Sequence, residues 1–232
     1  MKISVVIPTI NSEKRIKHTT FYIDNYLKKA VRKRIIKGYE IILVPQVSKD
    51  NTFDVVKKIA KKRIRAIYLP TPGKGIALTT GIKEAKNNFV LTIDDDLSYP
   101  IEFLEEAVKK IKNYDIVIGS RYLTKQRIPL KRKIASLCYR TLVKILFNLS
   151  VKDPQAGLKL IKKDIFKKIG LPEQIGYVWD TELLFKAQKH GFKICEIPIK
   201  YNFVENVLKI RKAAPEMLKG VIALWLKNLF KK

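Results

Sequence analysis

The sequence predicts an α/β protein built on one doubly wound, mostly parallel sheet. Short apolar runs alternate with stretches of helical period, no internal repeat interrupts the alternation, and no long linker divides the chain. Hydrophobic residues make up 47% of the 232 positions, which is ample for a core. We expect one domain over residues 1–204, followed by a basic, amphipathic helical appendage over residues 205–232.

The expected elements alternate along the first half of the chain. Apolar and β-branched runs predict strands at residues 3–7, 40–44, 66–69, 89–93 and 115–119, and the first of them ends at Pro8. Apolar residues three and four apart predict helices at residues 13–34, from about Thr52, and at residues 75–86 and 101–112. Such strand–helix units pair in parallel through right-handed crossovers, so a mostly parallel sheet follows.

Three consecutive carboxylates, Asp94, Asp95 and Asp96, follow the fourth expected strand. Ligands of open α/β sheets bind beyond the carboxyl ends of the strands, so this is the expected place for a site. The carboxylates repel one another unless a cation lies among them. Their oxygens suit a hard ion, Mg²⁺ or Mn²⁺, which usually also binds substrate phosphates. The alternative is a solvated acidic turn that caps the next helix.

The chain is strongly basic. Lys and Arg number 48 against 21 Asp and Glu, a net charge of +27. Such an excess indicates anionic partners: nucleotide phosphates, an acidic membrane surface or nucleic acid. Cys138 and Cys195 are too few for a disulfide framework, which favours a reducing compartment. We expect neither a signal peptide nor a membrane span of about 18 apolar residues.

Common nucleotide-binding and hydrolase motifs are missing from the sequence. Gly73-Lys74-Gly75 is too short for a P-loop, and no strand is followed by G-x-G-x-x-G. There is no H-E-x-x-H, serine elbow or zinc spacing. A nucleotide must therefore be held by a different arrangement.

Six segments follow one another in order and at plausible spacing: the opening strand at residues 4–11, Gly73-Lys74-Gly75 with Ala77 and Gly81, the acidic segment 94–97, residues 119–122, residues 153–159, and residues 179–184 with Gly191-Phe192 and residues 196–198. Together they resemble glycosyltransferase family 2, and most closely its dolichyl-phosphate mannose and glucose synthases. The resemblance implies a GT-A fold. It also implies an inverting transfer of a hexose from a nucleoside diphosphate sugar, of the GDP-mannose or UDP-glucose type, to a polyprenyl (dolichyl) phosphate.

The resemblance also implies the functions of particular residues. Asp94 and Asp96 are the expected metal ligands, for Mg²⁺ or Mn²⁺, and the expected catalytic residues are Asp96, Arg121 and Arg132. A phosphate acceptor is already anionic and needs no general base, so the arginines are expected to bring it to the anionic donor. The expected nucleotide-sugar-binding residues are Pro8, Thr9, Asn11, Glu13, Gln46, Lys74, Asp94, Asp95, Asp153, Gln155, Asp180 and Glu182.

Some positions depart from the family pattern. Pro45-Gln46 replaces a usual acidic pair, and Ser98 stands where mannose synthases often carry a glutamine ligand. These changes leave open a degenerate, non-catalytic member that binds a nucleotide or a lipid phosphate. A nucleic-acid-binding protein is suggested by charge alone, and the intact acidic segment argues against it.

Two amphipathic stretches, residues 128–151 and 215–232, have two interpretations. In the first stretch one stripe combines Ile134, Cys138, Leu142, Ile145 and Leu149. Each stretch either packs on the domain or lies in a membrane interface with its lysines on anionic headgroups. Trp225, in a basic amphipathic stretch, favours the interface for the second. We therefore expect a cytoplasmic protein, peripheral on the inner face of the cell membrane, with an anionic membrane surface as partner and no nucleic acid.

Overall fold

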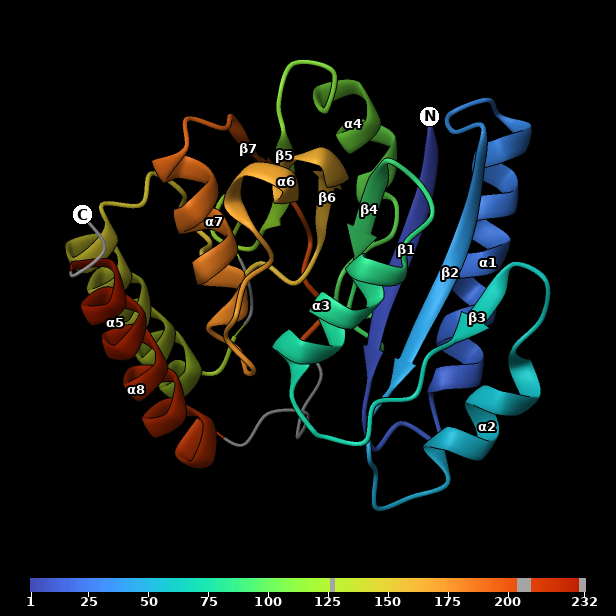
Figure 1. Ribbon diagram of the computed structural model, residues 1–232, viewed down its shortest axis with the longest axis horizontal. Coiled ribbons are helices and arrows are strands. Elements are labelled where there is room, and N and C mark those ends of the chain that lie inside the picture. The colour runs from blue at the N-terminus through green and yellow to red at the C-terminus, as the bar shows by residue number, and fades with distance from the viewer. Residues whose placement is uncertain (126–127, 204–209, 230–232) are drawn as a thin grey trace.

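Figure 1 shows a computed structural model that describes residues 1–125, 128–203 and 210–229. The expected domain boundary between residues 204 and 205 lies outside the described residues. Within them the strands are β1 (Lys2–Thr9), β2 (Gly38–Pro45), β3 (Ile64–Ala66), β4 (Phe89–Thr92), β5 (Ile116–Ser120), β6 (Lys159–Lys162) and β7 (Ile194–Pro198). The helices are α1 (Ile16–Arg32), α2 (Thr52–Ile59), α3 (Lys74–Glu84), α4 (Phe103–Lys110), α5 (Leu130–Phe147), the 3₁₀ turn η1 (Lys163–Ile165), α6 (Phe166–Ile169), α7 (Trp179–Lys189) and α8 (Ile210–Leu229).

The described strands form one seven-stranded sheet in the order β3-β2-β1-β4-β6-β5-β7. The sheet is mostly parallel, as predicted, except that β6 runs antiparallel to both β4 and β5. Neither β6 nor β7 is among the strands that the sequence predicts. Lysines at both ends of β6 conceal it, because a strand with Lys159 fully buried has no ordinary apolar signal.

The third strand is displaced from its expected position. Residues 66–69 are the predicted strand, whereas β3 ends at Ala66 and pairs with β2 through Ile64 and Ala66. Beyond β3 the chain keeps a looser contact with β2, since the Leu69 N–H donates to the carbonyl oxygen of Pro45 over 2.9 Å. The apolar run therefore extends past the regular pairing, and its position alone gives the wrong boundary.

Helices cover both faces of the sheet, which confirms the doubly wound arrangement. Successive residues of β1 face the two layers. Val5 belongs to the core cluster that includes residues of α1, α2 and α4, whereas Val6 belongs to the cluster that includes residues of α3, α5, α7 and α8. Both valines are fully buried, as expected for a parallel strand covered on its two faces.

The C-terminal helix is part of this packing. Figure 1 shows α8 beside α5, and their contact confirms the arrangement. Val221 and Leu224 on α8 are buried, as are Tyr139, Val143 and Phe147 on α5. The opposite faces remain exposed, with Leu130, Ile134, Leu137 and Ile145 on α5 and Leu218, Ile222, Leu226 and Leu229 on α8. No helix in the described part of the chain is long and apolar enough to cross a membrane.

The position of the site follows from the strand order. From β1 the sheet extends through β2 and β3 on one side and through β4 on the other. The connections leave the carboxyl ends of β1 and β4 in opposite directions, which opens a crevice where ligands bind in sheets of this type. Pro8 and Thr9 end β1, and Asp94 follows β4, so the carboxylates lie at this crevice.

Candidate active site

A pocket of about 790 Å³, here called the acidic pocket, lies at the carboxyl ends of β1, β2 and β4. Its walls come from six separate parts of the chain, ending with α8. The lining residues are Pro8, Ile10, Asn11, Arg15, Gln46, Pro72, Gly73, Lys74, Asp94, Asp95, Asp96, Glu173, Gln174, Ile175, Gly176, Tyr177, Val178, Glu216 and Met217. Seven of the expected site residues therefore share one pocket: Pro8, Asn11, Gln46, Lys74, Asp94, Asp95 and Asp96.

Basic side chains oppose the three carboxylates. Lys74, the first residue of α3, places Nζ 2.7 Å from Asp94 Oδ1 and 3.9 Å from Asp180 Oδ2. Arg15 lies 3.2 Å from Asp95 Oδ1. The repulsion expected from the sequence is thus relieved by cations from α3 and from the turn before α1. Arg15 is not among the site residues that the sequence predicts, because pairing across 80 residues leaves no local signal.

Asp95 differs from its two neighbours. Burial raises the pKa of its carboxyl to about 6, against the opposing charge of Arg15. The Ser12 hydroxyl donates to Asp95, and the Thr19 hydroxyl donates to its backbone carbonyl over 2.8 Å. These contacts tie Asp95 to the start of α1. Of the three carboxylates, Asp94 and Asp96 are therefore the better candidates to bind a cation.

Asp94 and Asp96 fit a divalent ion that arrives with its substrate. Within the described ranges, no three or more His, Cys, Asp or Glu side chains are grouped to hold a metal by themselves. Mg²⁺ is usually bound by one or two carboxylates, with substrate phosphates and water completing the sphere. A pair of pocket-lining carboxylates matches that pattern, whereas it does not match a resident structural metal.

A network of buried ion pairs lies next to the acidic pocket. Lys159 on β6 is fully buried and pairs with Asp180 on α7, which also faces Lys74. Burial lowers the pKa of Lys159, and the charge of Asp180 opposes that effect. The network links β6, α7 and α3, so it positions Lys74 at the carboxylates. The sequence marks Lys159 only as part of the segment at residues 153–159, since a lysine gives no sequence sign of being buried.

Gln46 occupies a fixed position on the pocket wall. It is buried, and its Oε1 accepts a hydrogen bond of 2.6 Å from the backbone N–H of Gly73. Gly73 has φ of +146°, a conformation that favours glycine. Gln46 therefore holds the loop that begins α3, in addition to facing the pocket.

Five expected site residues line neither the acidic pocket nor the cavity described below: Thr9, Glu13, Asp153, Asp180 and Glu182. Glu13 accepts from the backbone N–H and side chain of Asn51, which holds the loop before α2. Glu182 accepts from the N–H groups of Glu173 and Gln174, which holds the pocket wall. These residues support the pocket from outside, and their direct contact with a nucleotide stays a prediction.

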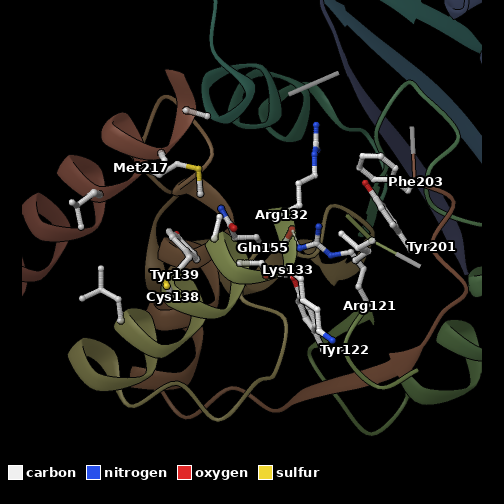
Figure 2. Close-up of a pocket in the computed structure, with 17 residues that line it drawn as sticks. Arg121, Tyr122, Arg132, Lys133, Cys138, Tyr139, Gln155, Tyr201, Phe203 and Met217 are labelled. Carbon is white, nitrogen blue, oxygen red and sulfur yellow. Dashed lines mark hydrogen bonds between the residues drawn. The ribbon is translucent and has the colours of Figure 1, made fainter. Parts of the chain in front are cut away.

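A second cavity of about 360 Å³, here called the basic cavity, lies between α5 and α8 (Figure 2). Arg121, Tyr122, Tyr201 and Phe203 lie at one end in this view, and Cys138, Tyr139 and Met217 lie at the other. Its lining residues are Arg121, Tyr122, Ile128, Arg132, Lys133, Ala135, Ser136, Cys138, Tyr139, Leu142, Gln155, Tyr201, Phe203, Ala213, Ala214, Met217 and Leu218. The expected residues Arg121, Arg132 and Gln155 thus meet here, apart from the acidic cluster.

Arg121 is held by a buried carboxylate. Its Nε and Nη2 donate to the two oxygens of Asp153, each over 2.8 Å. Burial lowers the pKa of Arg121, but the charge of Asp153 more than offsets this and the pKa lies well above its ordinary value. The pair leaves the Nη1 edge of the guanidinium for another acceptor. Arg132 lies over the ring of Phe203, 4.7 Å from its centroid.

The two cavities adjoin each other. Met217 lines both of them, so α8 separates an acidic pocket from a cavity that holds two arginines. An acidic pocket at the switch point of a doubly wound sheet, with basic side chains next to it, is the arrangement of a GT-A glycosyltransferase. Its parts can bind a cation with a diphosphate on one side and an anion on the other.

Family comparison agrees with this assignment. The model of Glycosyl transferase family 2 matches residues 4–170, and the chain belongs to that family. The chain is 33% identical over 236 residues to dolichyl-phosphate beta-glucosyltransferase ALG5A of Trichomonas vaginalis, covering 95% of this chain and 73% of that protein. It is 27% identical over 209 residues to glycosyltransferase AglD of Haloferax volcanii, covering 87% of this chain and 33% of that protein.

Solved structures share the fold. Glucosyl-3-phosphoglycerate synthase from Mycobacterium tuberculosis, in complex with Mn²⁺, uridine diphosphate and glucosyl-3-phosphoglycerate, has a TM-score of 0.73. The two chains are 21% identical, and the match covers 97% of this chain and 79% of that one. The same enzyme is also known in complex with Mn²⁺, uridine diphosphate glucose and phosphoglyceric acid, with a TM-score of 0.69. At this identity the likeness shows the fold alone.

Proposed function

We propose that this protein is an inverting glycosyltransferase that moves a hexose from a nucleoside diphosphate sugar to a polyprenyl phosphate at a membrane surface. The observation that carries the proposal is the shared wall at Met217, because it places the acidic pocket beside a cavity with two arginines. The relatives named as dolichyl-phosphate glucosyltransferases support this acceptor class and make uridine diphosphate glucose the first donor to test.

The donor occupies the acidic pocket. Asp94 and Asp96 hold Mg²⁺ or Mn²⁺, which when bound acts as a Lewis acid on the diphosphate. Lys74 lies at the same place and adds a second positive charge for the leaving diphosphate. Pro8, Asn11 and Gln46 line the pocket at the ends of β1 and β2, where they contact the nucleoside. Asp95 and Asp180 position these groups.

The acceptor phosphate enters the basic cavity. Arg121 offers the Nη1 edge that Asp153 leaves unused, and Arg132 and Lys133 line the same space. An acceptor phosphate oxygen attacks the anomeric carbon while the bond to the donor diphosphate breaks, and the diphosphate leaves with the electron pair. A single displacement inverts the anomeric centre. The arginines lower the repulsion between the two anions.

The membrane surface contacts the exposed faces of α5 and α8. Apolar side chains there include Ile134 and Ile145 on α5, exposed by 54% and 74%, and Ile222 and Leu226 on α8, each exposed by 42%. The exposed lysines Lys131, Lys133, Lys144, Lys219 and Lys227 lie on the same two helices. Apolar insertion together with basic flanks is typical of helices that lie in a lipid interface. This placement suits a cytoplasmic enzyme on the inner face of the membrane.

The test is a transfer assay with purified protein, a short-chain polyprenyl phosphate and Mn²⁺ or Mg²⁺. The donors are uridine diphosphate glucose, guanosine diphosphate mannose and matched nucleotide sugars, and product is followed by mass spectrometry. We expect metal-dependent formation of a β-linked polyprenyl-phosphate sugar from one of these α-linked donors. Metal-dependent donor binding without transfer to any polyprenyl phosphate contradicts the proposal.

A further inference from the structure

The C-terminal helix contributes to the acidic pocket, although it lies beyond the family match at residues 4–170. Glu216 and Met217 on α8 line the acidic pocket, and Met217 also lines the basic cavity. In the proposed reaction the hexose lies between the donor diphosphate and the acceptor phosphate. That position is the junction of the two cavities, and Glu216 precedes the junction residue on the donor side.

The packing of α8 holds Glu216 at this place. One turn further along, a Cβ on Gly220 would lie 2.9 Å from Cγ2 of Val178 and 3.2 Å from Oε1 of Gln174. The helix thus approaches the pocket wall as closely as glycine allows. Lys227 pairs with Glu173 of the same wall, and buried Val221 and Leu224 anchor the helix to the domain.

The chemistry of the Glu216 side chain limits the class of ligand that it can bind. An ionised carboxylate only accepts hydrogen bonds, so it repels a diphosphate and pairs with donors. Within the described residues Glu216 forms no ion pair and belongs to no cluster arranged for a metal. Tyr177, which carries a hydroxyl group, lines the same pocket. The donors that a nucleotide sugar offers near the junction are the hydroxyl groups of its hexose.

We propose that Glu216 binds hydroxyl groups of the transferred hexose and is a specificity-determining residue for the sugar. This inference rests on the proposed function and names a contact within it. The contact involves the sugar and not the nucleotide, so affinity for a nucleoside diphosphate without sugar does not depend on it. Sugar recognition is then supplied by the helix that also faces the lipid surface.

The experiment uses calorimetry in the presence of Mn²⁺ to compare the affinity for uridine diphosphate with the affinity for uridine diphosphate glucose. If the transfer assay selects another donor, that donor and its nucleoside diphosphate are compared instead. The variants are Glu216→Ala and Glu216→Gln, and the matched control is Glu106→Gln, an exposed glutamate on α4. A hydrogen bond to a charged group predicts that Glu216→Ala weakens nucleotide-sugar binding by about 10- to 100-fold. Diphosphate affinity stays within about twofold of the unsubstituted protein, as the loss concerns the sugar alone.

Deoxy-sugar donors make the assignment specific. A donor that lacks the hydroxyl bound by Glu216 loses affinity for the unsubstituted protein and loses nothing further in Glu216→Ala. Equal weakening of diphosphate and nucleotide sugar shows a structural effect and overturns the inference. The inference is also overturned if Glu216→Ala changes neither the affinity for the nucleotide sugar nor the selectivity against deoxy-sugar donors. The proposed function is unaffected by that result. If the unsubstituted protein binds no nucleotide sugar, the proposed function and this inference fail together.

Discussion

The ammonium group of Lys74 lies 2.7 Å from Oδ1 of Asp94, on the wall of the acidic pocket. The first residue of α3 thus places a cation at one of the two carboxylates proposed to hold the divalent ion. Burial lowers the pKa of Lys74, but Asp94 and Asp180 raise it by more, so the side chain stays protonated. We therefore propose that Lys74 would exchange Asp94 for the diphosphate when a donor binds with its metal ion.

Lys74→Met is therefore expected to tighten the binding of Mn²⁺ alone and to weaken the binding of Mn²⁺ with a nucleoside diphosphate. An ion pair worth roughly 1 kcal/mol predicts about a fivefold gain for the free ion. Electron paramagnetic resonance titration of Mn²⁺ measures it, with Lys83→Met at the exposed end of α3 as the control. Weaker binding of the free ion in Lys74→Met would show that Lys74 does not compete for Asp94.

Replacement of Asp94 and Asp96 together by asparagine is expected to abolish metal-dependent donor binding and to preserve the fold. The double variant removes both negative charges from the proposed metal ligands, while Lys74 keeps Asp180 as a partner at 3.9 Å. Calorimetry with Mn²⁺ and a nucleoside diphosphate tests binding, and circular dichroism tests folding. Asp54→Asn, an exposed change on α2, is the control. An unchanged affinity of the double variant for the nucleoside diphosphate in the presence of Mn²⁺ would contradict the assignment of Asp94 and Asp96 as metal ligands.

Arg121→Lys is expected to reduce kcat more than it raises the KM for the donor. In the proposed reaction the guanidinium, which is held by Asp153, bridges to the acceptor phosphate, and a lysine offers only a point charge. Loss of one preorganised contact to the reacting phosphates predicts about a 100-fold fall in kcat. Steady-state kinetics with a short-chain polyprenyl phosphate measures both constants, and thermal melting tests whether buried Asp153 remains satisfied. A higher KM with unchanged kcat would place Arg121 outside the reacting centre.

Leu224→Ala is expected to destabilise the protein by about 2–5 kcal/mol, because it empties a buried position between α8 and the domain. Leu226→Ala, two residues along the same helix and 42% exposed, is expected to change stability by less than about 0.5 kcal/mol. Denaturant unfolding compares the two. Equal effects would mean that α8 does not pack on the domain in solution.

Ile222→Ser, Leu226→Ser and Ile145→Ser combined are expected to remove the salt-resistant part of membrane binding. These side chains are exposed on α5 and α8, so the variant keeps the buried contacts of both helices. Sedimentation with anionic vesicles, at low and high salt, separates the apolar contribution from that of the lysines. The control is Tyr68→Ser, which alters an exposed aromatic residue that lies outside α5 and α8. If the control and the triple variant bind vesicles equally, the two helices are not the lipid contact.

Local sequence patterns are sufficient to predict the fold class and to locate the acidic segment at the end of a strand. Buried parallel strands are continuous apolar runs, so β1, β2, β4 and β5 each leave a clear local signal. The carboxylates that follow β4 are adjacent in sequence, and the rule that ligands bind at strand ends then locates the site. The segment resemblances added the family, which the match at residues 4–170 confirms.

Tertiary structure alone decided which side chains meet. Lys159 is a basic residue in a strand, and only burial against α7 pairs it with Asp180. Arg15 reaches Asp95 across 80 residues. Contacts between distant segments have no local pattern, because no constraint on spacing or period links their positions.

The C-terminal helix α8 shows what sequence pattern and tertiary structure each contribute. Its amphipathic pattern predicts a helix with one apolar side, but apolar side chains favour a protein core and a lipid interface for the same physical reason. Only the packed fold assigns Val221 and Leu224 to the core and leaves Ile222 and Leu226 exposed. Only the fold, too, brings Glu216 to the acidic pocket, since its position there depends on how closely Gly220 approaches Val178.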